Sequence, residues 1–249
     1  MSLFASAQQK AQTVKAEEKD VLGGSFTIPS GIYPSGIKMA YLDKWDSGAL
    51  YVGFEFAVLV DGKEMNHKEL ITISNQAGEF TYEKNGEVHP MPGFSMVDSI
   101  FRLATGKGFK EQTGVEVKQI KLYDKEAKAE VPKPKEVFME SLGKKLKLGI
   151  LAQTVDKTEK NPNWQPGMDK KKQYVPTGET REENVISKVF HFESDKTVSE
   201  IDANGSAEFF KAWEEKFKGK TINKAKGKPA GASGGTAGAP NQSASSLFN

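Results

Sequence analysis

The residues from Leu50 to Val60 restrict the fold of this chain more than any other segment. Apolar side chains occupy every second position, with Val52, Phe54 and Phe56 at the centre. A period of two places them on one face of a β-strand and places the intervening side chains on the other face. Asp61-Gly62 follows directly, and this dipeptide is typical of two-residue hairpin turns. The segment therefore predicts a half-buried strand that opens an antiparallel hairpin.

Alternating or β-rich runs predict further strands along the chain. They cover residues 37–41, 64–74, 80–82 with a hairpin turn at Asn85-Gly86, 115–123, 145–155 and 184–193. Helices are expected at three places. These are Ser95–Ala104, capped by Ser95 with Asp98 at the capping-box spacing, Lys135–Leu142, ended by Gly143, and Ala207–Lys218, capped by Ser206. Residues 131–135 contain two prolines and predict a stiff connector. The fold class that follows is mainly β with minor α.

The two ends of the chain differ from its centre in composition. Residues 1–20 are small, polar and charged, and we expect a flexible N-terminal arm. Residues 224–249 are expected to form a disordered C-terminal tail, because residues 230–249 carry no charged side chain and are rich in Gly, Ala and Ser. One folded domain is expected over residues 21–223. Apolar runs long enough for a signal peptide or a membrane span are missing, so we expect a cytoplasmic protein without a membrane partner.

Composition and motifs argue against several classes of enzyme. The formal net charge of the 249 residues is only +2, so any affinity for nucleic acid must come from clustered cations. The sequence contains no cysteine, which excludes disulfides and thiolate chemistry. Phosphate-loop and HExxH patterns are absent, and the three histidines, His67, His89 and His191, lie far apart. The sequence predicts a binding protein that is not an enzyme and uses no cofactor or metal.

A basic segment with two aromatic residues lies between the last two expected strands. Residues 157–181 carry three acidic residues, the aromatic residues Trp164 and Tyr174, and the cations Lys157, Lys160, Lys170, Lys171, Lys172 and Arg181. Cations attract a phosphate backbone, and exposed rings offer a flat face to an unpaired base. A long loop of this kind is what a groove for single-stranded nucleic acid requires. The alternative is a solvated insertion that is rich in lysine for solubility.

The order of expected elements predicts an OB-type barrel with insertions. In such barrels the loops after the first and fourth strands bind oligonucleotides across the face of the second and third strands. Here the first of these loops, residues 43–48, carries Lys44 and Trp45, and Tyr51 lies on the strand face opposite Phe54. These three residues join the candidate site. For Trp45 the alternative is a cover over the core edge, and for Tyr51 it is ordinary packing.

Several short motifs support the prediction of an OB-type barrel that binds nucleic acid. Gly31-Ile-Tyr33, Met39-Ala-Tyr41, Ser47-Gly-Ala49 before the long strand, and a C-terminal helix with Trp213 resemble the single-stranded DNA-binding proteins of tailed bacteriophages. The resemblance covers roughly residues 20–223. It implies an OB-type barrel that coats single-stranded DNA in replication, recombination and repair, and a tail that recruits partners. Many relatives have an acidic tail, whereas this tail is neutral.

The sequence thus predicts a sequence-tolerant single-stranded DNA-binding protein. If a phage encodes it, the protein is expected in the cytoplasm of the host cell. Leu247 and Phe248 near the C-terminus are candidates for docking replication or recombination proteins, or have no role. The main alternative is a non-enzymatic structural or scaffolding protein of a virion or large assembly. A nucleic-acid enzyme without recognisable motifs is a third hypothesis.

Overall fold

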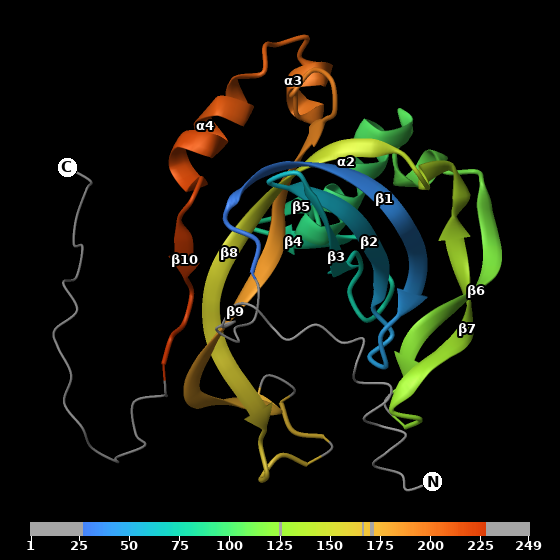
Figure 1. Cartoon of the computed structure of the whole chain (residues 1–249). Helices are drawn as coiled ribbons and strands as arrows, with labels where there is room; N and C mark the ends of the chain where they lie inside the picture. Colours follow the sequence, from blue (N-terminus) through green and yellow to red (C-terminus); the bar gives the residue numbers. More distant parts are fainter. Residues whose placement is uncertain (1–26, 125, 166, 170–171, 228–249) are drawn as a thin grey trace, which may run out of the picture.

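A large, strongly curved β-sheet forms most of the structure (Figure 1). The computed structural model describes residues 27–124, 126–165, 167–169 and 172–227. The main path of the sheet runs through β3 (Lys63–Thr72), β2 (Leu50–Val60), β1 (Gly31–Lys44), β8 (Lys145–Lys160) and β9 (Tyr174–His191), and neighbouring strands on it are antiparallel. Within the described residues the sheet is not closed, because no backbone ladder joins β3 to β9. The predicted mainly β fold is confirmed.

The β1–β2–β3 meander forms as predicted. β2 has the predicted bounds, and both turn residues after it, Asp61 and Gly62, have the positive φ values that a type I′ turn requires, 48° and 78°. Asn85 and Gly86 make the same kind of turn between β4 (Thr81–Lys84) and β5 (Glu87–Pro90). β1 is longer than predicted, because its first half pairs with β8 while its second half runs along β2.

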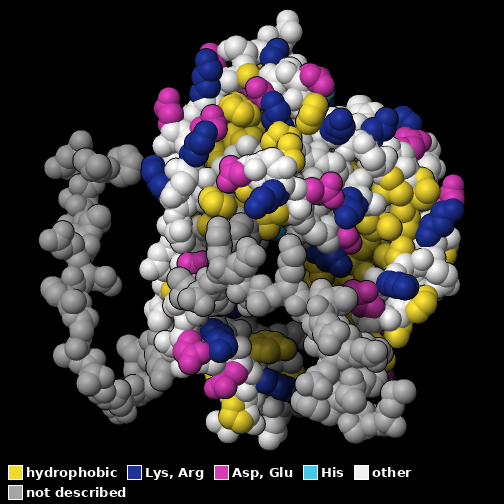
Figure 2. All heavy atoms as spheres, in the orientation of Figure 1, with side chains coloured by type: hydrophobic (Ala, Val, Ile, Leu, Met, Phe, Trp, Pro, Cys, Tyr) yellow, Lys and Arg dark blue, Asp and Glu magenta, His cyan; other side chains and the backbone are white. Residues whose placement is uncertain are grey.

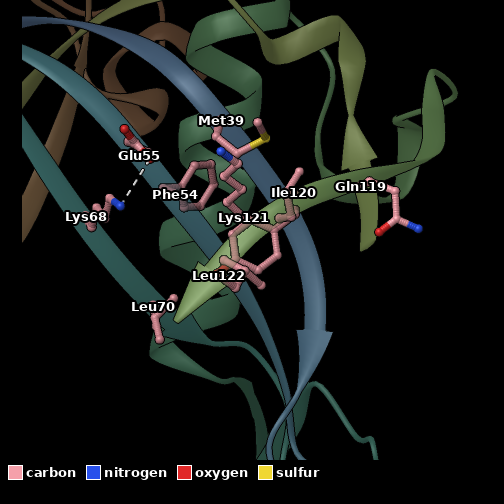
Figure 3. A pocket seen from close by; sticks show the side chains of 10 residues that line it. Met39, Phe54, Glu55, Lys68, Leu70, Gln119, Ile120, Lys121 and Leu122 are labelled. Atoms are coloured by element: carbon pink, nitrogen blue, oxygen red, sulfur yellow. Dashed lines mark ion pairs between the residues drawn. The ribbon is translucent and has the colours of Figure 1, made fainter. Parts of the chain in front are cut away.

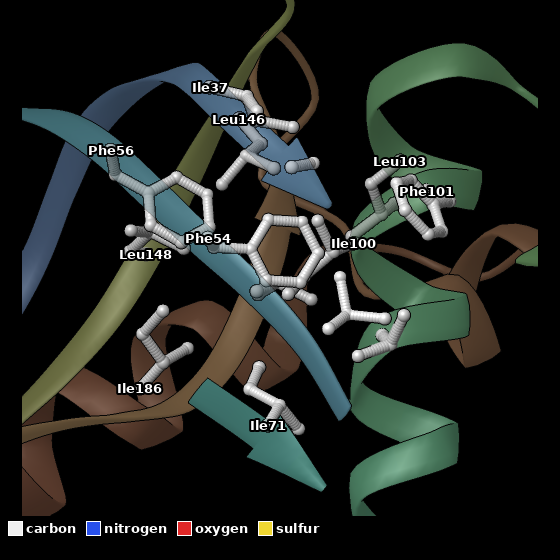
Figure 4. Close-up of a cluster of buried hydrophobic side chains, with 14 of the residues drawn as sticks. Ile37, Phe54, Phe56, Ile71, Ile100, Phe101, Leu103, Leu146, Leu148 and Ile186 are labelled. Atoms are coloured by element: carbon white, nitrogen blue, oxygen red, sulfur yellow. The ribbon is translucent and has the colours of Figure 1, made fainter. Parts of the chain in front are cut away.

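The main core lies between the inner face of the sheet and helix α2 (Pro92–Thr105) (Figure 4). Phe54 and Phe56 of β2 stack on each other with ring centroids 5.3 Å apart, and Phe101 of the helix packs against Phe54. Leu146 and Leu148 of β8 complete this cluster, and both are fully buried. The alternation that defines β2 in the sequence therefore sets the position of the core.

The start of α2 differs from the prediction. The helix begins at Pro92 rather than Ser95. Proline is favoured at the first helical position because its ring holds φ near the helical value, and because the N–H that it lacks would have no partner within the helix. Ser95 lies inside the helix, and Asp98 instead accepts a hydrogen bond from the Phe109 N–H at 2.8 Å. Gly106 ends the helix with φ 77°, as predicted.

The predicted connector at residues 131–135 is instead part of a strand. It lies in β7 (Ala129–Phe138), which pairs along its whole length with β6 (Val115–Asp124). Proline is tolerated at an unpaired strand edge, and β7 bonds to β1 only near Val137, which leaves most of its second edge free. The predicted helix 135–142 is also wrong, since only a 3₁₀ turn, Met139–Ser141, follows β7.

Strands β8 and β9 form the longest hairpin of the sheet. Their pairing continues to Lys160 opposite Tyr174, so the predicted loop 157–181 is strand at both ends and only residues 161–173 connect the strands. Between β3 and β9, the Ile186 N–H donates to the Glu69 carboxylate at 2.9 Å, and His67 Nε2 lies 3.0 Å from the same oxygen. One side-chain contact therefore bridges the two outer strands where a backbone ladder is missing.

The C-terminal segment packs on the outside of the sheet. After α3 (Val198–Asp202), helix α4 (Glu208–Phe217) lays Trp213 against Gly149, and β10 (Thr221–Asn223) runs parallel to β8. The indole N–H of Trp213 donates to Ser187 Oγ at 3.0 Å. The expected cap by Ser206 is wrong, because Ala207 is the N-cap and has no side-chain cap bond. The arm 1–20 and the tail from residue 228 lie outside the described residues.

Candidate nucleic-acid interface

The register of β1, β2 and β3 arranges their outward side chains in three rows. Ladder partners place Asp43, Tyr51 and Thr72 in the first row, Tyr41, Gly53 and Leu70 in the second, and Met39, Glu55 and Lys68 in the third. These side chains lie on the face opposite the Phe54–Phe56 core, because strand side chains alternate between faces. We call this surface the outer face.

The β1–β2 turn covers one end of the outer face with an aromatic pair. The Trp45 N–H donates to the carbonyl of Ala49, and the Gly48 N–H donates to the carbonyl of Trp45. Trp45 then lies over Tyr51, with ring centroids 4.3 Å apart, and its indole N–H donates to Thr72 Oγ1 at 2.9 Å. Trp45 is partly exposed, whereas Tyr51 is 8% exposed. Trp45 thus offers ring surface to a ligand, and Tyr51 mainly supports it.

Asp43 connects this end of the face to β7. Its carboxylate accepts a hydrogen bond from the Tyr51 hydroxyl at 2.8 Å and pairs with Lys135 Nζ at 2.6 Å. Partial burial raises the pKa of Asp43, but the contacts with Lys135, the Lys44 N–H and Tyr51 outweigh it, so this pKa ends below its ordinary value. Burial, followed by the Asp43 charge, raises the pKa of the Tyr51 phenol. The neutral phenol and the ionised carboxylate therefore stabilise each other.

The ribbon end of β8 and β9 carries three of the predicted cations. Lys157 pairs with Glu179 at 2.8 Å, and Arg181 pairs with Glu183 at 2.8 Å. Lys160 is exposed, and within the described residues it has no ion pair. Exposed ion pairs contribute little to stability, so Lys157 and Arg181 can exchange their partners for phosphate at small cost.

The connection after Lys160 and the first residue of β9, Tyr174, hold the remaining residues predicted for this segment. Trp164 is half-buried, and its indole N–H donates to the carbonyl of Asp169 at 3.1 Å, which fixes the ring within the connection. Tyr174 is 55% exposed, and Lys172 is exposed. Lys170 and Lys171 lie outside the described residues, as do the tail residues Leu247 and Phe248.

The β6–β7 hairpin covers the outer face and leaves a cleft between them (Figure 3). The cleft has a volume of about 330 Å³, near the small end of the range for ligand pockets. Its walls include Leu70 from β3 and Ile120 and Leu122 from β6, and Tyr41 lies between them. Tyr41 is 7% exposed and lies against Gly53, where a Cβ atom would be 2.3 Å from the ring. We call this space the arm cleft.

Two lysines, Lys68 and Lys121, against one carboxylate, Glu55, leave the rim of the arm cleft net positive. Lys68 lies 3.6 Å from Glu55, which also accepts a hydrogen bond from the Asn66 amide at 2.9 Å. Lys121 lines the cleft and has no ion pair within the described residues (Figure 3). An apolar slot with cations at its mouth suits a ligand that joins a flat apolar group to an anion.

The structure brings some predicted residues together and separates others. Trp45 and Tyr51 are in contact, and Lys44 lies beside them in the chain. The β1–β2 turn and the β8–β9 tip both lie toward the lower end of the molecule in Figure 1. Sequence reasoning missed the arm cleft, since it assigned residues 131–135 of β7 to a connector and residues 135–142 to a helix. The alternating apolar residues Ile120 and Leu122 of β6 are the signal in the sequence that could have indicated an apolar strand face here.

Two chemical features are missing from the described residues. No group of three or more His, Asp or Glu side chains there is placed to hold a metal ion. None of the helices in the described ranges is both long and apolar enough to cross a bilayer.

Comparisons with protein-family models, with curated proteins and with solved structures found no match to this chain.

Proposed function

We propose that the protein binds single-stranded DNA with little sequence preference and coats it during replication or recombination, as the resemblance to the phage proteins implies. The observation that carries the proposal is the outer face, where the exposed ring of Trp45 stacks on Tyr51, which contacts Tyr41 in the wall of a cleft that Lys68 and Lys121 also line. Rings that stack bases and cations that neutralise phosphates are the two elements of such sites.

The connectivity of the sheet supports an OB-type fold for this function. A β1–β2–β3 meander leads to helix α2, and β8 and β9 follow as the fourth and fifth strands of the path. An OB barrel is partly open, and it binds oligonucleotides across its second and third strands and the loops after its first and fourth. The corresponding parts here are the outer face, the β1–β2 turn and the β8–β9 connection. The β6–β7 hairpin would then be an insertion.

Tryptophan fluorescence tests the proposal directly. The chain has three tryptophans, and Trp213 of α4 is buried against Gly149 of β8, so Trp45 and Trp164 should report contact with a base. Titration with oligo-dT should quench the signal, and Trp45→Phe and Trp164→Phe variants separate the two reporters. A duplex of equal length is the control, because its paired bases cannot reach the rings. Absence of oligo-dT binding at low salt, or equal affinity for duplex, would refute the function.

A further inference from the structure

The arm cleft lies on the path from the exposed aromatic turn toward the centre of the outer face. Trp45 stacks on Tyr51, and Tyr51 contacts Tyr41 edge to face, with ring centroids 6.4 Å apart. Tyr41 in turn lines the cleft. A ligand that stacks on Trp45 and continues across the face therefore reaches the cleft next.

The shape and polarity of the cleft match one nucleotide better than an extended peptide. Its walls are largely apolar and close together, since Leu70 on β3 and Ile120 and Leu122 on β6 line one space of about 330 Å³, with Glu55 and Gln119 as further polar lining residues. A base is flat and largely apolar on its faces, and stacking against side chains favours it whatever its sequence. The phosphate joined to that base would meet Lys121 and Lys68 at the rim.

The outer wall of the cleft is anchored at one end. β7 bonds to β1 at Tyr41 and Leu42, and Lys135 pairs with Asp43. Farther along the arm, Tyr123 is 63% exposed and Val117 is 68% exposed, and apolar side chains gather over the β6–β7 side of the molecule (Figure 2). The attached end of the hairpin holds Ile120 opposite the outer face. The cleft therefore exists before a ligand binds, and its residues need little ordering on binding.

We propose that the arm cleft holds one unstacked base of the bound DNA strand, with its phosphate at Lys121 and Lys68. This inference rests on the proposed function. It adds a specific place for a base beneath the β6–β7 hairpin, beyond the stacking at the exposed turn.

Single-cysteine labelling tests this inference, because the chain has no cysteine of its own. Leu70→Cys places a thiol in the cleft, and Ile201→Cys places one on α3, which contacts α2 on the core side of the sheet, away from the outer face. The two side chains are matched in exposure, 47% and 44%. Each variant is labelled with a maleimide alone, with oligo-dT, and with an abasic deoxyribose-phosphate oligomer of equal length. Both oligomers are used at concentrations shown by fluorescence anisotropy to saturate the protein.

The expected result is protection that depends on both position and base. At a free oligo-dT concentration of about 100 times Kd, nearly all protein is bound, so labelling of L70C should slow by at least about tenfold. Labelling of I201C should change by less than about twofold with oligo-dT, and labelling of L70C should change by less than about twofold with the abasic oligomer.

Three outcomes would overturn the inference in distinguishable ways. If oligo-dT binds and L70C labels at its free rate, the DNA does not enter the cleft, and the proposed function stands. If the abasic oligomer protects as well as oligo-dT, only the backbone passes through the cleft. If the wild-type protein does not bind oligo-dT, the proposed function fails and this inference fails with it.

Discussion

Gly53→Ala is the most informative single change, because Gly53 sets the position of Tyr41. A Cβ atom at this position would lie 2.3 Å from Cζ and 2.6 Å from the hydroxyl of Tyr41. The tyrosine ring is 7% exposed and packs in a small cluster with Tyr51, so it cannot move without losing contacts. Overpacking of this kind typically costs about 1–3 kcal/mol of unfolding free energy. The reduced entropy of the unfolded chain returns about 0.4–1 kcal/mol.

The net effect should be visible in thermal unfolding followed by circular dichroism. A loss of about 1–2 kcal/mol corresponds to a fall in Tm of roughly 2–8 °C for a chain of this size. Gly36→Ala is the matched control, since no atom lies within 4 Å of the added Cβ in the same meander. The control should keep or slightly raise Tm. A Gly53→Ala variant as stable as Gly36→Ala would show that Tyr41 is not held against Gly53.

Three further predictions concern binding and pH. Trp164→Ala should cost roughly 1–3 kcal/mol of affinity for oligo-dT and leave the salt dependence unchanged, because a ring releases no counterions; unchanged affinity would exclude this ring from the site. Lys160→Ala should flatten the log–log salt slope by about 0.7, the value for one lost phosphate contact, and an unaltered slope would contradict that contact. Burial raises the pKa of Tyr41 and Tyr51 above the ordinary 10.0, so folding favours the neutral phenols. The two phenols contribute their full share of the unfolding free energy below pH 10.0, and this share should be lost as pH rises above it. The unfolding free energy of Tyr51→Phe should fall less steeply with pH than that of the wild type, and equal pH profiles would refute the assignment.

The parts of the fold that local chemistry decides could be predicted from the sequence. Alternation fixed the bounds of β2, and the turn dipeptides Asp61-Gly62 and Asn85-Gly86 adopt the backbone angles expected of them. Trp45 and Tyr51 were also assigned to the correct strand end and face. In each case the signal lies within a few neighbouring residues, where period and turn preference operate.

The missed parts depend on pairing between distant residues. The prolines of β7 read as a connector because the sequence does not reveal which strand edge stays unpaired. Beyond Val155 both faces of the β8–β9 ribbon are largely exposed, so no apolar alternation marks the continuing strands. The arm cleft combines β3 with β6, about fifty residues apart, and only the register of the sheet places Leu70 opposite Ile120.

The contact between Glu69 and Ile186 has a consequence for the motions of the sheet. A continuous ladder opens only when many hydrogen bonds break together, whereas the Glu69–Ile186 contact is a single hydrogen bond that is lost when one carboxylate rotates away. The amide of Ile186 should therefore exchange with solvent faster than its neighbours inside the β8–β9 ladder. Glu69→Gln keeps an oxygen acceptor and Glu69→Ala removes it, so their exchange rates at this single amide measure how firmly the two outer strands are joined.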